Sequence, residues 1–132
     1  MNSHEEAFVT AFIAKQKQDR YKELLSNPKR RSKLLDKMNH GLDFNLSLAE
    51  VIPSAGREAQ HVVRLLRERG ALAVCHVIAD DTTLDRQDLS LIDAIERATA
   101  SHFAAVVSCV PGKLAFYKEE DPGEWYVLER RP

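Results

Sequence analysis

The sequence predicts an α+β protein in which an N-terminal helical hairpin precedes an α-β-α-β-β-β core. The first forty residues carry apolar side chains at the spacing of amphipathic helices. The segments 71–79 and 103–110 are nearly continuous apolar runs, as in strands that are buried on both faces. The segments 113–118 and 125–129 flank a polar loop, which indicates an antiparallel hairpin. These observations predict a four-stranded mixed sheet covered by helices.

The length and composition fit one globular domain. The chain has 132 residues, of which 44% are hydrophobic and 30% are charged, close to the average. No apolar run approaches the roughly 20 residues that cross a bilayer. Disordered, fibrous and membrane-spanning classes are therefore excluded. We expect residues 1–40 to form a helical layer and residues 54–132 to form an α/β core.

Two helices are expected in the helical layer. The tetrapeptide Ser3–Glu6 is a capping box, which predicts the start of a helix over about residues 4–25. Asn27 is a good N-cap and Pro28 suits the first helical position, so a second helix should follow at once. It is expected to end near the turn-forming segment 39–41.

The middle segment, 42–53, carries two conflicting patterns. Apolar and polar residues alternate in its first half, which is the period of a half-buried strand. Ser47–Glu50, however, repeats the capping-box pattern. We expect an extended segment that leads into a helical turn laid over the core. Ser54 is then expected to cap a helix that ends at Gly70.

The core is expected to begin with a βαβ unit. A helix from about residue 86 or 88 to 100 lies between the two apolar runs, 71–79 and 103–110. Two strands joined by one crossover helix are parallel, and the connection is right-handed by strong precedent. The antiparallel hairpin of 113–118 and 125–129 would complete the sheet.

The net charge of −1 conceals an uneven distribution of charge. Residues 1–40 carry nine Lys or Arg against five Asp or Glu, whereas residues 80–132 carry six against eleven. The densest basic cluster, which we call the basic patch, opens the second helix and consists of Lys29, Arg30, Arg31 and Lys33. Cations beside free backbone amides attract phosphate or carboxylate, so the patch predicts a surface for an anion, a protein or nucleic acid. A merely solvated helix face is the alternative.

Asp80, Asp81 and Ser108 are candidates for a cleft at the end of the sheet. The aspartates directly follow the first buried run, and Ser108 lies near the end of the second. Ligands of open α/β sheets bind at the carboxyl ends of parallel strands, and paired carboxylates there suit Mg²⁺. These residues would serve a small-ligand or metal-dependent enzyme. The alternative is that the aspartates are turn and N-cap residues.

His76 and the two cysteines lie inside the buried runs. His76 is expected to be a hydrogen-bonded core group, and it cannot pair with Cys75 because strand neighbours point to opposite faces. Cys75 and Cys109 are expected to be buried free thiols, which pack as small hydrophobes. A disulfide between neighbouring strands stays open as an alternative. An apolar setting makes a thiol inert, so nucleophilic catalysis is not predicted.

The aromatic residues Tyr117, Trp125 and Tyr126 gather in the C-terminal hairpin. On an uncovered part of the sheet these amphipathic side chains would suit a protein interface. Packing against the helical layer is the alternative.

The motifs that the chain lacks favour binding over catalysis. It contains no GxSxG, GxGxxG, GxxxxGK[ST] or HExxH pattern and no zinc-ligand spacing, so no catalytic residue, cofactor or metal is predicted. The leading hypothesis is a non-enzymatic protein-binding or regulatory module. The alternatives are an enzyme that uses the cleft near Asp80 and Asp81, and anion or nucleic-acid binding by residues 29–33. The acidic N-terminus, without a signal-peptide pattern, favours the cytoplasm.

Overall fold

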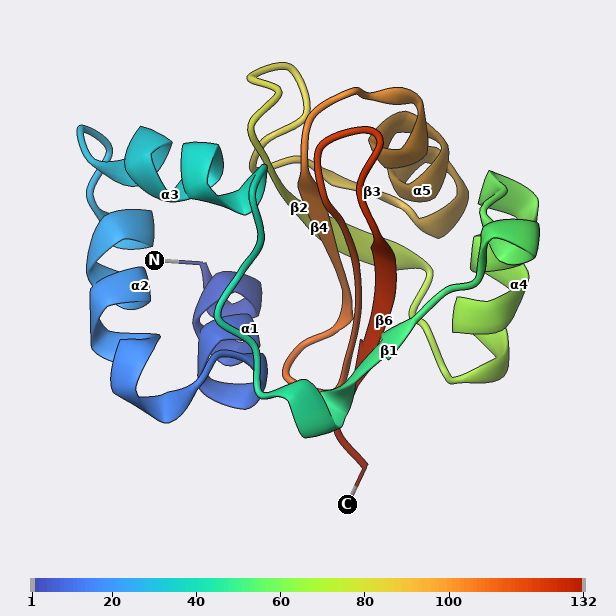
Figure 1. The fold of residues 1–132 in the computed structure, drawn as a ribbon, viewed down its shortest axis with the longest axis horizontal. Coiled ribbons are helices and arrows are strands. Elements are labelled where there is room, and N and C mark those ends of the chain that lie inside the picture. Colours follow the sequence, from blue (N-terminus) through green and yellow to red (C-terminus); the bar gives the residue numbers. More distant parts are fainter. Residues whose placement is uncertain (1, 132) are drawn as a thin grey trace.

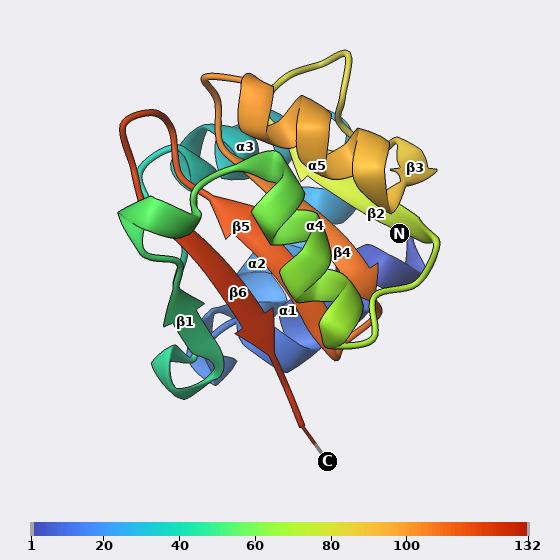
Figure 2. The same cartoon turned by 90° about the vertical axis from the view of Figure 1, so that its right-hand side faces the viewer.

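A six-stranded antiparallel sheet separates two layers of helices in the computed structural model, which describes residues 2–131 (Figure 1). The strand order is β1 (Ala49–Val51), β6 (Trp125–Glu129), β5 (Leu114–Lys118), β4 (Ala105–Val110), β2 (Val74–Ala79), β3 (Asp88–Ser90). One face is covered by α1 (Ser3–Phe12), α2 (Gln18–Ser26) and α3 (Arg31–Met38). The other is covered by α4 (Ala59–Glu68) and α5 (Leu91–Ala100) (Figure 2). The predicted α+β class is confirmed, although the sheet has six strands rather than four.

Both faces of the central strands are buried, because each strand packs against helices on both sides. Val77, Val107 and Phe116 belong to the core between the sheet and the α4–α5 layer. Their neighbours Val106 and Tyr117 belong to a second core, between the sheet and the α1–α3 layer. Successive side chains of each strand therefore enter the two cores alternately, which explains why these segments are apolar without a break.

The predicted parallel βαβ unit is wrong, because β2 and β4 are antiparallel. The cause is β3, a three-residue strand within the segment assigned to a loop and the start of a helix. It pairs antiparallel with β2, with Ser90 opposite Val74, and so returns the chain to the start of β2. α5 then runs back along the sheet, and β4 begins with Ala105 opposite Ala79 at the end of β2.

The helix predicted over residues 4–25 is divided into α1 and α2, although the segment contains neither glycine nor proline. Ile13 is extended and forms an isolated β-bridge with Phe44, which fixes the break. The side chain of Gln18 donates a hydrogen bond to the Ile13 carbonyl at 3.0 Å, so it caps the end of α1. A tertiary contact thus overrides the local helix pattern.

Two predicted helix starts are shifted. Asn2, not Ser3, is the N-cap of α1, and its side chain accepts a hydrogen bond from the His4 amide at 2.7 Å. Ser54 begins a short 3-10 turn, Ser54–Gly56, and the N-cap of α4 is Glu58.

The segment 42–53 is extended and then turns, as predicted, but Ser47–Glu50 does not start an α-helix. A 3-10 turn, Leu46–Leu48, is capped by the side chain of Asn45 and leads directly into β1. β1 pairs with β6 at the edge of the sheet.

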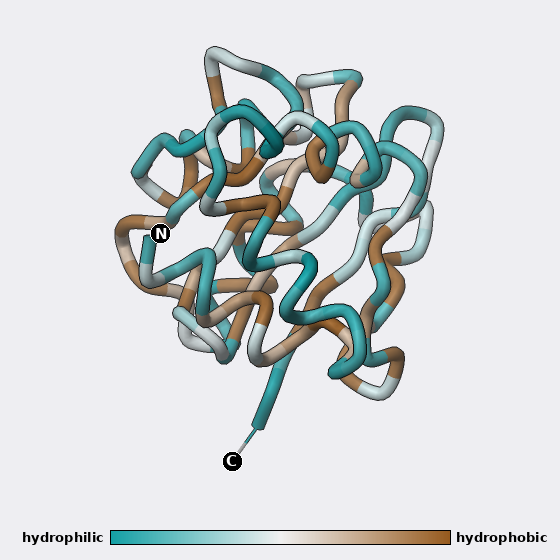
Figure 3. Tube along the Cα trace, turned by 90° about the vertical axis from the view of Figure 1, so that its left-hand side faces the viewer, coloured by the Kyte–Doolittle hydropathy of each residue, from teal (hydrophilic) through white to brown (hydrophobic). Residues whose placement is uncertain are grey.

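The end of α3 is tied to the sheet by hydrogen bonds of buried groups. The Tyr117 hydroxyl donates to the Met38 carbonyl. The Asn39 side chain donates to Asp80 at 2.8 Å and accepts from the Ala104 amide at 2.8 Å. Figure 3 faces this helical layer and shows polar and apolar residues interleaved along its helices. Within residues 2–131, no helix has the length and apolar composition needed to cross a bilayer.

Candidate functional site

Five ionisable side chains meet between the α1–α3 layer and the sheet. We call them the charged cluster: Glu5, Arg31, His76, Asp85 and Asp88. They come from α1, α3, β2, the loop after β2, and β3. The first three are 4% exposed or less. Removing a charge from water is costly unless it is paired, so the partners of each group decide what the cluster can do.

Arg31 lies at the centre of the charged cluster. Its guanidinium donates two hydrogen bonds to Glu5, at 2.7 and 2.9 Å, and two to Asp85, at 2.8 and 2.9 Å. A fifth goes to the Leu25 carbonyl at 3.2 Å, so all five N–H donors are committed. Burial alone would lower the pKa of Arg31, but the two carboxylates outweigh it and raise that pKa.

His76 lies between two carboxylates. Its Nε2 is 2.7 Å from Glu5, and its Nδ1 is 2.8 Å from Asp88. Burial lowers the pKa of His76, but these hydrogen bonds outweigh burial and raise it above 6.5. Burial has the opposite effect on a carboxyl group and raises the pKa of Glu5, but hydrogen bonds from His76 and Arg31 outweigh it and lower this pKa to about 2. The prediction that His76 is a hydrogen-bonded core group is confirmed.

His4 and Ser108 extend the charged cluster along the same face. The His4 ring stacks on His76 with ring centroids 5.7 Å apart, and its Nδ1 is 2.8 Å from the Ser108 hydroxyl. Burial and the neighbouring His76 lower the pKa of His4. Ser108 is only 1% exposed, so its hydroxyl serves as a buried hydrogen-bonding group.

A cleft of about 300 Å³ opens beside the charged cluster. Glu5, Arg31 and His76 line it, and Arg86 lies at its side. Since the donors of Arg31 and His76 already bind Glu5, Asp85 and Asp88, an anion in the cleft would have to displace a bond between buried charges. We therefore interpret the charged cluster as a joint that holds α1 and α3 against β2 and β3.

The structure separates the four residues of the predicted basic patch. Arg31 is 4% exposed and belongs to the charged cluster. Arg30 forms an ion pair with Glu23. Lys29 and Lys33 are exposed. The proposed anion, protein or nucleic-acid surface would thus consist mainly of the two lysines.

The structure does not bring together the three residues of the predicted cleft. Because β2 and β4 are antiparallel, Asp80 lies beside the start of β4, where its amide bonds to Ala104. Ser108 lies four residues further along β4, about 13 Å away at the rise of a strand. Asp80 accepts a hydrogen bond from Asn39, and Asp81 caps a turn by accepting from Thr83. Within residues 2–131, no group of three or more His, Cys, Asp or Glu is placed to hold a metal ion.

The aromatic side chains of the C-terminal hairpin pack within the two cores. Trp125 packs edge-on against Phe116 on the α4–α5 side. Tyr117 stacks on Tyr126 and contacts Phe44 on the opposite face. These contacts correspond to the packing alternative.

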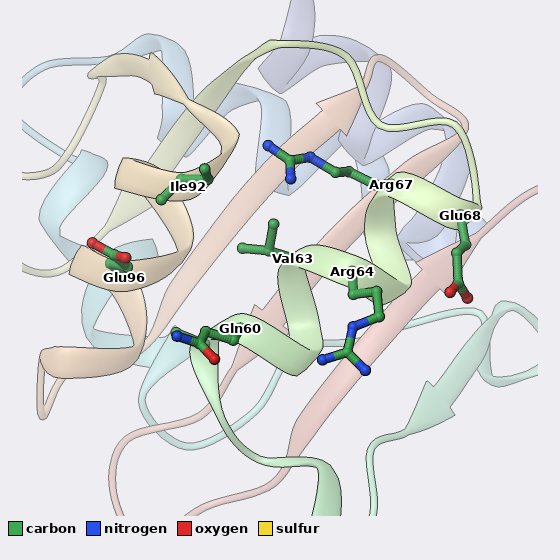
Figure 4. A pocket seen from close by; sticks show the side chains of 8 residues that line it. Gln60, Val63, Arg64, Arg67, Glu68, Ile92 and Glu96 are labelled. Atoms are coloured by element: carbon green, nitrogen blue, oxygen red, sulfur yellow. The ribbon is translucent and has the colours of Figure 1, made fainter.

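A second concave surface lies between α4 and α5, and we call it the α4–α5 groove. It has a volume of about 430 Å³. Its apolar residues are Ala59, Val63 and Ile92, the last of which is 42% exposed. Figure 4 shows the Arg67 side chain extending from α4 toward α5, with Ile92 and Glu96 across the groove.

The charged residues that line the α4–α5 groove have no ion-pair partner in the described part of the chain, a property that they share with Lys29 and Lys33 of the other helical layer. Among residues 2–131, Arg64, Arg67, Glu68 and Glu96 form no ion pair. Arg69, the next residue after α4, is by contrast paired with both Glu50 and Glu129. The groove therefore combines exposed apolar surface with charges available to a partner.

A signal for this groove is present in the sequence, in the spacing of two arginines of α4. Arg64 and Arg67 are three residues apart, on the helix face opposite Val62 and Leu66, and so share one exposed stripe. The basic patch is the more conspicuous feature because four of the five residues 29–33 are cations. Comparison of the chain with protein-family models, curated proteins and solved structures gave no significant match.

Proposed function

We propose that the protein is a non-enzymatic protein-binding module and that the α4–α5 groove is its docking surface. The observation that carries this proposal is an apolar groove lined by charges of both signs that lack ion-pair partners within residues 2–131. Exposed apolar surface rimmed by polar groups is typical of interaction sites. The charged cluster supports the proposal indirectly. The hydrogen-bond donors of Arg31 and His76 already bind groups of the chain, which suits a structural role rather than ligand binding.

The distribution of charge specifies the occupant. The α4 wall carries Arg64, Arg67 and Glu68, and the α5 wall carries Glu96. Asp93, three residues before Glu96 on α5, is also exposed. A partner has to present an acidic surface beside a basic one. A second copy of this chain does so, since a two-fold axis sets the α4 of each copy against the α5 of the other. The occupant is therefore a second copy.

The apolar part of the groove adds to this complementarity. A two-fold axis through the groove would bury Ile92 of both copies, and covering partly exposed apolar side chains stabilises an interface by about 25 cal/mol per Å². The two helices have ten residues each, so each is about 15 Å long. Such a face lies at the small end of specific interfaces, and we expect a weak dimer that dissociates on dilution.

Sedimentation velocity over a concentration series tests this function. The wild-type chain should pass from monomer to dimer as its concentration rises. The R64E/R67E variant should stay monomeric, because its basic wall becomes acidic and opposes the acidic wall of its partner. The matched control is K29E/K33E, which changes the net charge by the same amount on exposed residues of the other helical layer.

Three outcomes would overturn the proposal in different ways. A wild-type chain that stays monomeric at every concentration contradicts a second copy as the occupant. Dimerisation that R64E/R67E leaves unchanged contradicts the groove. If K29E/K33E loses dimerisation and R64E/R67E keeps it, the docking surface lies at the exposed lysines of the basic patch and not in the groove.

The compartment in which we expect the protein to act is the cytoplasm. Its two cysteines are free and buried, which supports a reducing environment.

A further inference from the structure

Cys75 and Cys109 lie close together on neighbouring antiparallel strands. The register of β2 and β4 runs from Ala79 opposite Ala105 to His76 opposite Ser108. Cys75 and Cys109 are the next residues beyond this last pair. Both side chains are 0% exposed and belong to the core on the α4–α5 side of the sheet. The two thiols therefore point to the same side of the sheet from neighbouring strands.

The regular ladder of β2 and β4 ends at His76 and Ser108, and the two cysteines are the next residue of each strand. β4 is irregular between Ser108 and Val110, where the Cys109 carbonyl accepts a hydrogen bond from the Leu72 amide at 3.4 Å. Neighbouring strands lie about 4.7–4.9 Å apart. This spacing falls within the Cα separations of about 4.4–6.8 Å that a disulfide accepts.

The two sulfurs are chemically unequal. The Cys75 thiol donates to the Leu72 carbonyl at 3.9 Å and the Cys109 thiol to the Val107 carbonyl at 3.6 Å. The interaction between the two thiols lowers the pKa of Cys75 and raises that of Cys109, and burial adds to the rise at Cys109. Cys75 is thus the better nucleophile and Cys109 the resolving thiol.

We propose that Cys75 and Cys109 form an oxidisable pair that closes to an intrachain disulfide when the protein meets a peroxide. The Cys75 thiolate attacks one peroxide oxygen, the O–O bond breaks, and hydroxide leaves and takes up a proton to become water. The sulfur of Cys109 then attacks the resulting sulfenic acid, the S–S bond forms, and the S–O bond breaks. The Cys109 proton leaves with the hydroxide as a second water. The dithiol gives up two electrons, and the peroxide is reduced to two waters.

Intact mass spectrometry of the folded full-length chain tests this proposal. The protein is treated with hydrogen peroxide, unfolded and then labelled with N-ethylmaleimide. Untreated protein should accept two labels. Treated protein should accept none, should have lost two hydrogen atoms, and should yield a linked peptide containing Cys75 and Cys109. Dithiothreitol should restore both labelling sites.

Two variants separate the roles of the sulfurs. C109S should stop at the sulfenic acid of Cys75, which dimedone traps as an adduct. C75S should react much more slowly, because burial alone still raises the pKa of the remaining Cys109 thiol. Two labels on the treated wild type would overturn the proposal, as would conversion of one cysteine to a sulfinic acid without a linked peptide. The result is independent of the α4–α5 groove, since the disulfide lies within one chain.

Discussion

At the scale of single residues, Arg31 has the most demanding environment in the protein. Its guanidinium is buried and joins α3 to α1 through Glu5 and to the loop after β2 through Asp85. Removing it would leave two carboxylates in the interior without their cation. The position therefore requires arginine, because no other side chain offers five donors in a planar fork.

The R31M variant tests this requirement. It should lower the free energy of unfolding by about 3–5 kcal/mol, the usual effect of breaking a buried ion pair by removing one partner. K33M on the same helix is the control and should change it by less than about 0.5 kcal/mol, because Lys33 is exposed. Urea denaturation measures both variants. An R31M chain as stable as K33M would contradict the charged cluster as a joint.

The pH dependence of stability follows from Glu5 and His76. The pKa of Glu5 falls on folding from 4.5 to about 2, so its contribution is complete above pH 4.5 and is lost as pH falls toward 2. The pKa of His76 rises on folding above 6.5, so its contribution is complete below pH 6.5 and is lost as pH rises through the folded value. Glu5 and His76 together should therefore contribute most between pH 4.5 and 6.5. His4, whose pKa falls on folding, contributes fully above pH 6.5 and less as pH falls below it.

Thermal unfolding of the wild type and H76Q across a pH series measures this effect. The wild-type midpoint should fall as pH rises above 6.5, and H76Q should lack this alkaline decline because glutamine does not titrate. Parallel curves for the two proteins above pH 6.5 would show that His76 does not carry the dependence.

The limits of sequence reasoning at the residue scale are visible in the basic patch. Lys29, Arg30, Arg31 and Lys33 are equivalent in composition, yet only Arg31 turns inward. Helical spacing could have suggested this, since Arg31 lies three and four residues before the buried Leu34 and Leu35. Its partners Glu5 and Asp85 are far away in the sequence, so no local pattern could identify them.

At the scale of elements, a continuous apolar run indicates that both faces of a strand are covered. The runs 71–79 and 103–110 predicted the existence of β2 and β4, but each strand begins later than its run, and Leu72, Val74 and Phe103 are exposed rather than buried. The runs did not determine strand direction, because an antiparallel sheet between two helical layers needs the same apolar residues as a parallel one. The direction depends on β3, which has only three residues and is too short to show a period. The break at Ile13 escaped prediction because its cause is the bridge to Phe44.

Asn39 offers a test of how one element docks on another. Its side chain links the end of α3 to Asp80 and to the Ala104 amide. N39A should lower the free energy of unfolding by about 1–3 kcal/mol, because a buried amide loses its acceptor. D36A, on the exposed side of α3, is the control and should have little effect. Equal stability of N39A and D36A in urea would contradict the docking role.

At the scale of the whole molecule, the distribution of paired and unpaired charge matters more than the net charge of −1. Four of the nine basic residues of 1–40 form ion pairs, among them Arg31 with Glu5 and Lys37 with Asp43. The α4–α5 layer keeps Arg64, Arg67 and Glu96 unpaired within residues 2–131. The excess of basic residues in 1–40 therefore pointed to the α1–α3 layer, which covers the other face of the sheet from the proposed docking surface.

Mixing two charge-swapped variants tests the proposed docking surface most directly. R64E/R67E makes both walls of the groove acidic, and D93R/E96R makes both walls basic, so each variant alone should be monomeric in sedimentation velocity. In the mixture, each two-fold contact again joins an acidic wall to a basic wall. We predict that the mixture forms a one-to-one heterodimer. A mixture that stays monomeric while the wild type dimerises would contradict two-fold binding through the α4–α5 groove.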